Sequence, residues 1–359
     1  MRQPSIPQGV IALLLAQLAW LLLAGVTSAQ TTISMACAAD LQRYCAGVKP
    51  GQGRLVQCLH DRELLEGCKA FLLHARGCAP EAGRVVECIT PSDTDPAIKR
   101  FNRVHYVLFN KNTGPNANLL VFLTGTGGEP PGPLAFLHAA ADAGYRVVSL
   151  DFNDEPAVAV YCPPKPPACS GNFRRMRIDG DGISIDPAID NTGAESIVNR
   201  FSKLTAYLEQ KEPQQGWGSY LDNGAPDWSR IAVAGQSQGA GMAAYIAKEH
   251  VLARVILFSS PWDFVRPKGN ARTLAPWIAV AAKTPPERWF GGYHEREIEA
   301  ALLAKSYAAL RIPPANIRVF KGDLPQALRG RSDRNPFHGQ GLQNPAYQED
   351  RAFFLGHSP

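Results

Sequence analysis

Short apolar runs alternate with amphipathic or alanine-rich segments from about residue 105 to the end of the chain. The runs have the length of buried strands and cover residues 105–109, 119–123, 145–150, 231–234, 255–258, 288–293 and 317–320. The segments between them that favour helices cover residues 133–143, 195–208, 240–248 and 295–310. Strands that alternate with helices are typical of a mostly parallel sheet covered on both faces. The pattern predicts an α/β fold for this part of the chain.

Cysteines set the chain before residue 100 apart. Six of the eight lie between Cys37 and Cys88, and the even number favours disulfides. No Cys-x-x-Cys pair occurs, which argues against a zinc site. A segment this short needs such cross-links because it cannot bury a large core. We therefore expect a small cysteine-rich helical module at residues 36–90, a linker at 91–100 and the α/β domain at 101–359.

The N-terminus has the pattern of a targeting segment. Arg2 precedes an apolar stretch at 10–26, and small residues follow at 27–29. This predicts a signal peptide over residues 1–29. An uncleaved anchor is the alternative, because the apolar stretch is long enough to approach a membrane span. No later stretch has that length, so we expect no span in the mature chain and a secreted or periplasmic location.

Composition adds a constraint on partners. The 359 residues are 45% hydrophobic and 19% charged, with a net charge of +5, which is typical of a globular protein with a large core. Lysine and arginine are scattered rather than gathered among aromatic residues, so nucleic-acid binding is not expected. Asp179, Asp181, Asp186 and Asp190 lack the spacing of a calcium loop, and we interpret them as part of a polar loop with no metal.

The strongest chemical signal is Gly-Gln-Ser-Gln-Gly at residues 235–239. It lies between an apolar strand-like run and an alanine-rich helix-like run, which is the context in which Gly-x-Ser-x-Gly places a nucleophile on a sharp turn. We therefore predict Ser237 as a nucleophile. An ordinary glycine-rich turn is the alternative.

The cysteine-rich segment resembles the cysteine-rich repeat of the Golgi apparatus sialoglycoprotein, also called the cysteine-rich FGF-receptor family. The resemblance covers residues 36–72 and rests on the cysteine spacing, a Pro-Gly turn at 50–51 and Cys58-Leu59. It implies a helical hairpin with Cys37 bonded to Cys68 and Cys45 to Cys58, which leaves Cys78 and Cys88 to close a local loop. It also implies a contact with a protein or a glycan, and a purely structural cap is the alternative. Separately, Cys162 and Cys169 bracket a proline-rich loop, and we expect them to pair.

Residues 100–359 resemble the α/β-hydrolase superfamily, and in detail a group of bacterial hydrolases without a defined substrate. The resemblance rests on the elbow at 235–239 together with the motifs at 216–220, 228–229, 258–263 and 284–288. It implies an α/β-hydrolase fold and a Ser-His-acid triad, with no metal or cofactor. Of eight histidines, His338 stands in the polar loop after the last strand, where this family has its base. A loop histidine without a function is the alternative.

The resemblance also implies an acid and an oxyanion hole. The acid usually follows the seventh strand, which points to Glu297, although relatives more often have Asp there. Asp263 is the runner-up and Asp323 the third choice. The backbone N–H of Gln238 is the expected first oxyanion donor, and Thr126 in the glycine-rich loop at 124–128 is the expected second donor.

These expectations lead to a secreted serine hydrolase that cleaves an ester, similar to a carboxylesterase, lipase or cutinase, through an acyl-enzyme. The substrate is a small-molecule or polymeric ester. An acyltransferase on the same fold and a non-catalytic binding protein that uses the cysteine-rich module stay open as alternatives.

Overall fold

The computed structural model describes residues 37–48, 54–59, 62–75, 77–180, 189, 191–266, 272–326 and 334–356. The predicted signal peptide lies outside these residues. The chain divides into two compact units, Met1–Ala79 and Pro80–Pro359. Among the helices formed by the described residues, none is long and apolar enough to cross a membrane.

The first unit contains the helices α3 (Ala38–Tyr44), α4 (Arg54–Leu59) and α5 (Glu66–Ala75). Disulfides join Cys37 to Cys68 and Cys45 to Cys58, with Cα atoms 4.5 and 5.9 Å apart. These are the pairs that the resemblance implies. Leu59 and Leu72 pack around the bridges, so the cross-links lie at the centre of a very small core.

The remaining cysteines are also oxidised. Cys162 and Cys169 are bonded to each other. Cys78 and Cys88 are disulfide-bonded as well. All cysteines of the chain lie in the described residues, and none of them is free.

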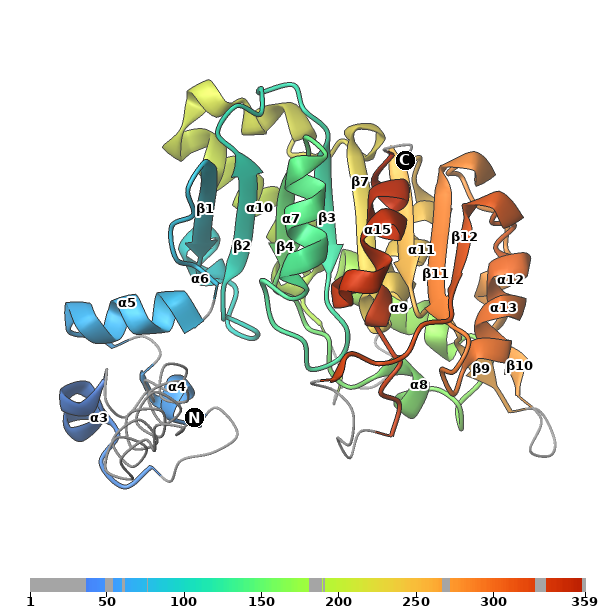
Figure 1. Ribbon diagram of the computed structural model, residues 1–359, viewed down its shortest axis with the longest axis horizontal. Helices are drawn as coiled ribbons and strands as arrows, with labels where there is room; N and C mark the ends of the chain where they lie inside the picture. The colour runs from blue at the N-terminus through green and yellow to red at the C-terminus, as the bar shows by residue number, and fades with distance from the viewer. Residues whose placement is uncertain are drawn as a thin grey trace, which may run out of the picture. The chain divides into compact units, whose positions relative to one another are not determined.

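The second unit is built on an eight-stranded sheet with the order β1-β2-β4-β3-β7-β8-β11-β12 (Figure 1). β2 runs antiparallel to both of its neighbours. The other six strands of the sheet are parallel to one another, in the order β4-β3-β7-β8-β11-β12. The strands are β1 (Arg84–Ile89), β2 (His105–Asn110), β3 (Leu119–Leu123), β4 (Arg146–Leu150), β7 (Ile231–Gln236), β8 (Arg254–Phe258), β11 (Trp289–His294) and β12 (Ile317–Phe320).

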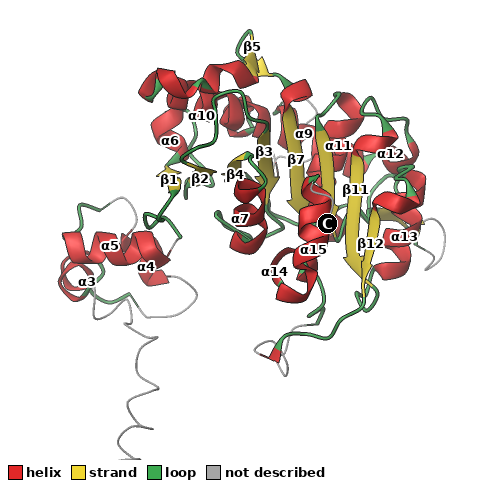
Figure 2. Cartoon of the chain, turned by 45° about the horizontal axis from the view of Figure 1, so that its top comes forward, coloured by secondary structure: helices red, strands yellow, loops and turns green. Residues whose placement is uncertain are grey.

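Helices cover both faces of the sheet, which explains why its central strands β3, β7 and β8 are largely apolar (Figure 2). α7 (Leu134–Asp142) and α15 (Gln348–Leu355) pack on one face. The other face carries α9 (Cys169–Asp179), α10 (Ile197–Lys211), α11 (Gln238–Glu249) and α13 (Ala300–Ala309). In β3, Leu119, Val121 and Leu123 point to the second face, and Leu120 and Phe122 point to the first.

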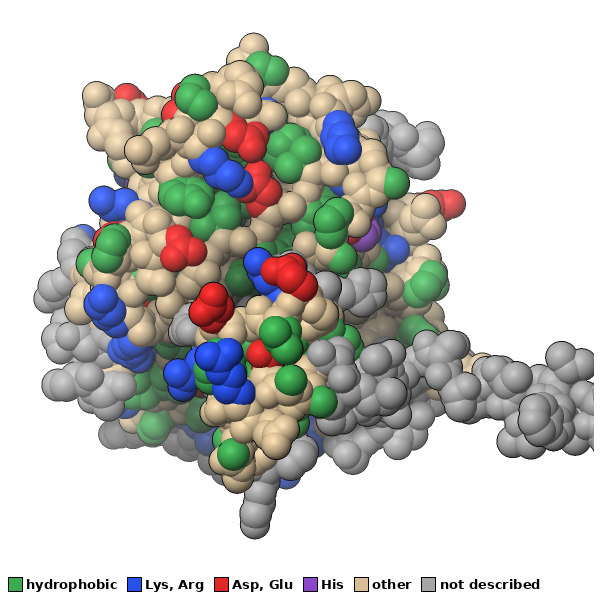
Figure 3. Space-filling view, turned by 90° about the vertical axis from the view of Figure 1, so that its left-hand side faces the viewer, with side chains coloured by type: hydrophobic (Ala, Val, Ile, Leu, Met, Phe, Trp, Pro, Cys, Tyr) green, Lys and Arg blue, Asp and Glu red, His purple; other side chains and the backbone are tan. Residues whose placement is uncertain are grey.

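Shorter elements complete the unit. The short helices are α6 (Pro91–Thr94), α8 (Val158–Tyr161), α12 (Pro276–Ala279) and α14 (Gln340–Gln343). The two small strand pairs are β5 (Leu221–Asp222) with β6 (Ala225–Pro226) and β9 (Phe264–Val265) with β10 (Thr273–Leu274). On the face shown in Figure 3, Lys and Arg side chains are interspersed with Asp and Glu, in keeping with the scattered charges of the sequence.

The predicted boundary at residue 90 differs from the structure. β1 pairs with β2 along its whole length, so residues 84–89 are the edge strand of the sheet rather than part of the cysteine-rich module. The expected linker at 91–100 contains α6 instead of being fully irregular. Cys88 lies inside β1. Because the prediction assigned this cysteine to the module, it overlooked the β-branched residues around it that favour a strand.

A second difference concerns the segment predicted as a helix from residue 295 to 310. The helix α13 begins only at Ala300. The residues before it form a turn in which the Glu297 N–H donates to the His294 carbonyl. This turn directly follows β11, and it carries the carboxylate predicted as the acid.

Candidate active site

The turn between β7 and α11 holds Ser237 in a strained conformation, with φ 53° and ψ −121°. Few residues other than glycine adopt this region, and such strain persists only where the surroundings enforce it. The flanking glycines show how it is enforced. A Cβ on Gly235 would lie 2.4 Å from the carbonyl carbon of Gly239, and a Cβ on Gly239 would lie 2.0 Å from the Leu123 oxygen. The Gly-x-Ser-x-Gly spacing is therefore a steric requirement of this turn.

The turn is also fixed by hydrogen bonds. The Ser237 N–H donates to the Phe258 carbonyl at 2.9 Å, which ties the turn to the end of β8. Ser237 is the residue before the first turn of α11, where free N–H groups and the helix dipole favour negative charge. The backbone N–H of Gln238 belongs to this first turn.

His338 and Glu297 are brought together although 41 positions separate them. Nδ1 of His338 lies 2.8 Å from Oε2 of Glu297. The Glu297 side chain is 1% exposed, and that of His338 is 23% exposed. A carboxylate on Nδ1 fixes the tautomer of the ring, so that Nε2 is the nitrogen available to exchange a proton with a substrate.

The second oxygen of Glu297 is held in place by two donors. Oε1 accepts hydrogen bonds from the Ser259 hydroxyl and from the His294 N–H, both at 2.8 Å. The Ser259 hydroxyl in turn accepts from the Gly339 N–H at 3.3 Å. Ser259 therefore links the carboxylate to the residue beside His338, and it does so from a left-handed backbone with φ 57°.

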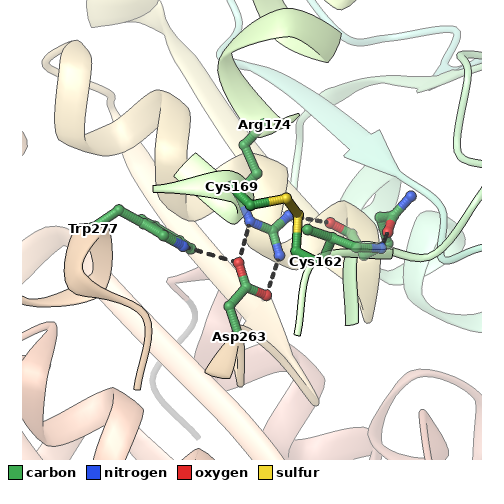
Figure 4. Close-up of a disulfide and its surroundings, with 7 residues drawn as sticks. Cys162, Cys169, Arg174, Asp263 and Trp277 are labelled. Atoms are coloured by element: carbon green, nitrogen blue, oxygen red, sulfur yellow. Dashed lines mark hydrogen bonds and ion pairs between the residues drawn. A yellow bond between two sulfur atoms is a disulfide. The ribbon is translucent and has the colours of Figure 1, made fainter. Parts of the chain in front are cut away.

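Asp263, the runner-up acid, lies in a different network (Figure 4). Its carboxylate accepts two hydrogen bonds from Arg174, at 2.6 and 2.8 Å, and one from the Trp277 indole at 2.9 Å. Arg174 also donates to the Gln238 carbonyl at 3.2 Å. Both charged side chains are buried. Asp263 thus supports the first turn of α11 and makes no contact with His338.

Asp323, the third choice, is on the surface. It forms an ion pair with Arg296 at 2.7 Å, and its side chain is 71% exposed. Of the three predicted carboxylates, Glu297 is the only one with a histidine partner among the residues that the structure describes.

The glycine-rich loop after β3 faces the elbow. A Cβ on Gly125 would lie 2.4 Å from the Gln236 amide oxygen and 3.0 Å from the Ser237 Cβ, so a larger residue here would press on both side chains. The Gly128 N–H donates to the Gly125 carbonyl at 2.8 Å and closes a tight turn around Thr126. Thr126 lines the same cavity as Ser237 and Gln238. The loop therefore lies beside the Ser237 turn.

The His338 loop also reaches the elbow. His338 and Gln236 line a common cavity of about 320 Å³. A Cβ on Gly339 would lie 3.2 Å from the Gln236 amide nitrogen. The loops after β3, β7, β11 and β12 therefore meet at the carboxyl edge of the sheet and carry Thr126, Ser237, Glu297 and His338, respectively.

Two supporting groups escaped the sequence prediction. Ser259 lies in the Phe-Ser-Ser-Pro-Trp-Asp stretch at 258–263, which was noted only for its resemblance. Arg174 lies in α9, a helix that the apolar pattern did not predict because it contains several buried polar side chains. Nothing in local composition indicates that either residue contacts the site.

A buried carboxylate next to the site provides a stability test. Asp154 is fully buried, and neither carboxylate oxygen has a hydrogen-bond partner among the described residues. Burial raises the pKa of Asp154 to about 7, with nearby Asp151 and Glu155 adding to the rise and Arg103 opposing it. The carboxyl group is therefore neutral in the folded protein at acidic pH.

We expect the Asp154→Asn protein to gain stability relative to the native chain as pH rises. The pKa of Asp154 in the folded protein lies above the unfolded value of 3.8. Its contribution to the free energy of unfolding is therefore fully present below pH 3.8 and is lost as pH rises through 7. The free energy of unfolding of the variant relative to the native chain should increase by on the order of 2–4 kcal/mol between pH 4 and pH 8. Urea unfolding at both pH values measures this, with exposed Asp222→Asn as the control. A difference that is the same at both pH values would contradict the assignment.

One family model matches part of the chain. Residues 28–62 match the model of a family described as a cysteine-rich repeat. No curated protein matches the chain in sequence.

Several solved structures are similar to this chain at low identity. Esterase 2 of Thermogutta terrifontis is 14% identical over 76% of this chain and 93% of its own, with a TM-score of 0.42. An esterase of the bacterial hormone-sensitive lipase family is 15% identical over 91% of this chain and 97% of its own, with a TM-score of 0.41. A putative dienelactone hydrolase from Klebsiella pneumoniae is 12% identical over 77% of this chain and 99% of its own, with a TM-score of 0.35.

The fold is identified from its own geometry. The sheet order places β4 between β2 and β3. β7, on the other side of β3, ends in a Gly-x-Ser-x-Gly turn from which the helix α11 begins. An acidic residue and then a histidine follow the serine along the chain, as in this fold. The chain has the α/β-hydrolase fold, preceded in sequence by a cysteine-rich module.

Proposed function

We propose that this protein is a serine hydrolase that cleaves a carboxylic ester through an acyl-enzyme. Ser237 is the nucleophile, His338 the general base and Glu297 the acid. The observation that carries the proposal is the buried Glu297 carboxylate bound to Nδ1 of His338, on a loop that adjoins the strained Ser237 turn.

In the first half of the reaction, the Ser237 hydroxyl attacks the ester carbonyl while His338 takes up its proton on Nε2. The tetrahedral oxyanion is stabilised by the N–H groups of Gln238 and Thr126. When the intermediate collapses, His338 gives its proton to the departing alcohol and Ser237 keeps the acyl group. A water molecule then repeats the sequence and releases the acid.

The strained turn contributes to this chemistry before substrate binds. It holds the Ser237 side chain clear of the strand, next to the first turn of α11. Because the donors are fixed by backbone geometry, they need no rearrangement when negative charge develops. Glu297 stabilises the imidazolium and is itself held by Ser259 and by the His294 N–H.

The oxidised cysteines support an extracellular or periplasmic location, because disulfides persist in oxidising compartments. We propose that residues 1–29 direct export and that the mature chain begins near Gln30. We further propose that the cysteine-rich module is a separate unit whose role is either a cap or a contact with a protein or glycan.

The function is tested with 4-nitrophenyl esters and the purified mature protein. We expect release of 4-nitrophenol and complete inactivation by a fluorophosphonate, in the presence of EDTA as in its absence. Addition of an alcohol and analysis of the products separate hydrolysis from acyl transfer. A folded protein with no turnover and no fluorophosphonate reaction would overturn the proposal and favour a binding protein.

The identity of the acid has its own test. We expect Glu297→Gln to lower kcat on the order of 10⁴-fold, because an amide on Nδ1 holds the ring in the wrong tautomer. Asp323→Asn should have no effect, since its carboxylate is on the surface. Asp263→Asn should destabilise the fold by leaving Arg174 with a weaker partner, and it should not reproduce the Glu297 effect at a temperature where it is folded. Steady-state kinetics together with circular dichroism distinguish these outcomes. A fully active Glu297→Gln protein would show that another residue is the acid of the triad.

A further inference from the structure

The described residues form unequal cavities on the two sides of the elbow. Ser237, Thr126 and Trp262 line one of about 90 Å³, together with the segment 157–160. His338 and Gln236 line the other, of about 320 Å³. This difference in size bears on which esters the site can accept.

The proposed mechanism assigns the two cavities to the two halves of an ester. His338 gives its proton to the departing alcohol, so the alcohol has to lie beside His338. The acyl group stays on Ser237 and has to occupy the space that Ser237 lines without His338. The larger cavity is therefore the alcohol side and the smaller one the acyl side. This assignment rests on the proposed function.

The wall of the acyl cavity is tightly held. The side chain of Gln238 accepts a hydrogen bond from the Val158 N–H at 2.6 Å and donates to the carbonyls of Asp154 and Pro156. Directly beyond the wall, the Cys162–Cys169 disulfide ties the end of α8 to the start of α9. Because the wall is bonded to the residue after the nucleophile, it cannot move away without disturbing the elbow.

The charged residues that line this cavity offer no free charge to a ligand. Both oxygens of Asp263 are bound by Arg174, and one of them also by Trp277. The remaining polar contact of Arg174 goes to the Gln238 carbonyl. The apolar side chains of Ala157, Val158 and Trp262 line it together with the polar Thr126, Gln238 and Ser260. The cavity suits a small apolar group.

Its volume sets a limit on chain length. At about 90 Å³ it has less than a third of the volume of the cavity of about 320 Å³ beside His338. It therefore favours a short acyl chain over a long one. Trp262 lines this cavity and stacks on Phe264, with ring centroids 6.3 Å apart, which keeps the indole in place.

The alcohol side has the opposite character. Its volume is within the range of small-molecule sites. Polar side chains of Thr124, Glu129, Gln236 and Gln343 line it beside His338. These groups can donate to and accept from hydroxyls, so a polyhydroxylated alcohol such as a sugar fits this side better than a simple alkyl alcohol.

We propose that the substrates are esters of short acids on a larger polyhydroxylated alcohol, and that Trp262 limits the length of the acyl chain.

The acyl limit is tested with 4-nitrophenyl acetate, butyrate and octanoate, which share one alcohol. We expect kcat/KM for octanoate to be at least about 100-fold below that for butyrate. Trp262→Ala should raise the octanoate-to-butyrate ratio at least about tenfold, and Trp262→Phe should raise it less. Val280→Ala, an exposed residue away from both cavities, is the control. Octanoate turnover equal to that of butyrate, or a ratio unchanged in both folded Trp262 variants, would overturn the limit.

The alcohol preference is tested at constant acyl group, with ethyl acetate and an acetylated monosaccharide. We expect kcat/KM per ester to be at least about tenfold higher for the sugar, measured as released acetate. Equal values, or a preference for ethyl acetate, would overturn this half of the proposal. If Ser237→Ala is inactive on every ester while these preferences fail, the hydrolase proposal stands and only the substrate class is wrong.

Discussion

Replacing Ser237 by alanine should abolish ester turnover, with a loss of kcat on the order of 10⁴–10⁶-fold. The loss is this large because the acyl-enzyme cannot form without the hydroxyl. A 10⁴-fold loss corresponds to roughly 5 kcal/mol of transition-state stabilisation. Alanine keeps the Cβ, so the backbone of the turn stays under the same steric constraint. The variant should therefore fold normally.

The Ser237→Ala measurement needs a matched control. Ser229 is exposed and its hydroxyl bonds only to the neighbouring Asp227 among the described residues, so Ser229→Ala should keep full activity. Circular dichroism and thermal unfolding of both variants show whether a loss is chemical or structural. If Ser237→Ala retained native turnover on all esters, Ser237 would not be the nucleophile.

His338→Ala should lower kcat nearly as far as Ser237→Ala, because triad residues act as a unit. For the same reason, the double variant should be no worse than either single variant. Removal of the ring enlarges a cavity that already measures about 320 Å³. We therefore expect added imidazole to restore part of the activity of His338→Ala and none of that of Ser237→Ala.

His138→Ala is the control for this prediction. His138 lies on α7 and contacts Glu81 at 3.0 Å, far along the chain from the elbow. Its loss should change stability slightly and leave both kcat and the response to imidazole unaltered. A His338→Ala protein with native kcat would show that another group accepts the proton.

Much of this architecture follows from local pattern. The strands β2, β3, β7 and β8 contain continuous apolar runs because both faces of the sheet are covered, and this makes them visible in the sequence. The elbow is visible because Gly235 and Gly239 meet backbone atoms at distances that no Cβ tolerates. The choice of Glu297 and His338 came from the resemblance, which implies an acid and a base at these places after their strands, rather than from composition.

Other parts depend on contacts between distant segments. β1 is an edge strand whose partner is β2, and its cysteine drew it into the wrong module. α13 starts later than expected because the turn after β11 is held by the Glu297 carboxylate on the His294 N–H. The Arg174–Asp263 pair joins residues 89 positions apart, and Asp263 was a plausible acid until its partners were known. Local propensity contains no information on any of these contacts.

The most direct test of the central claim is to identify the residue that a fluorophosphonate modifies. The mature protein is labelled to completion, digested after reduction and alkylation, and the adduct is located by mass spectrometry. We predict one adduct, on Ser237, which is absent from the Ser237→Ala protein and greatly slowed in His338→Ala. An adduct on another serine, or labelling of Ser237→Ala at the native rate, would contradict the account.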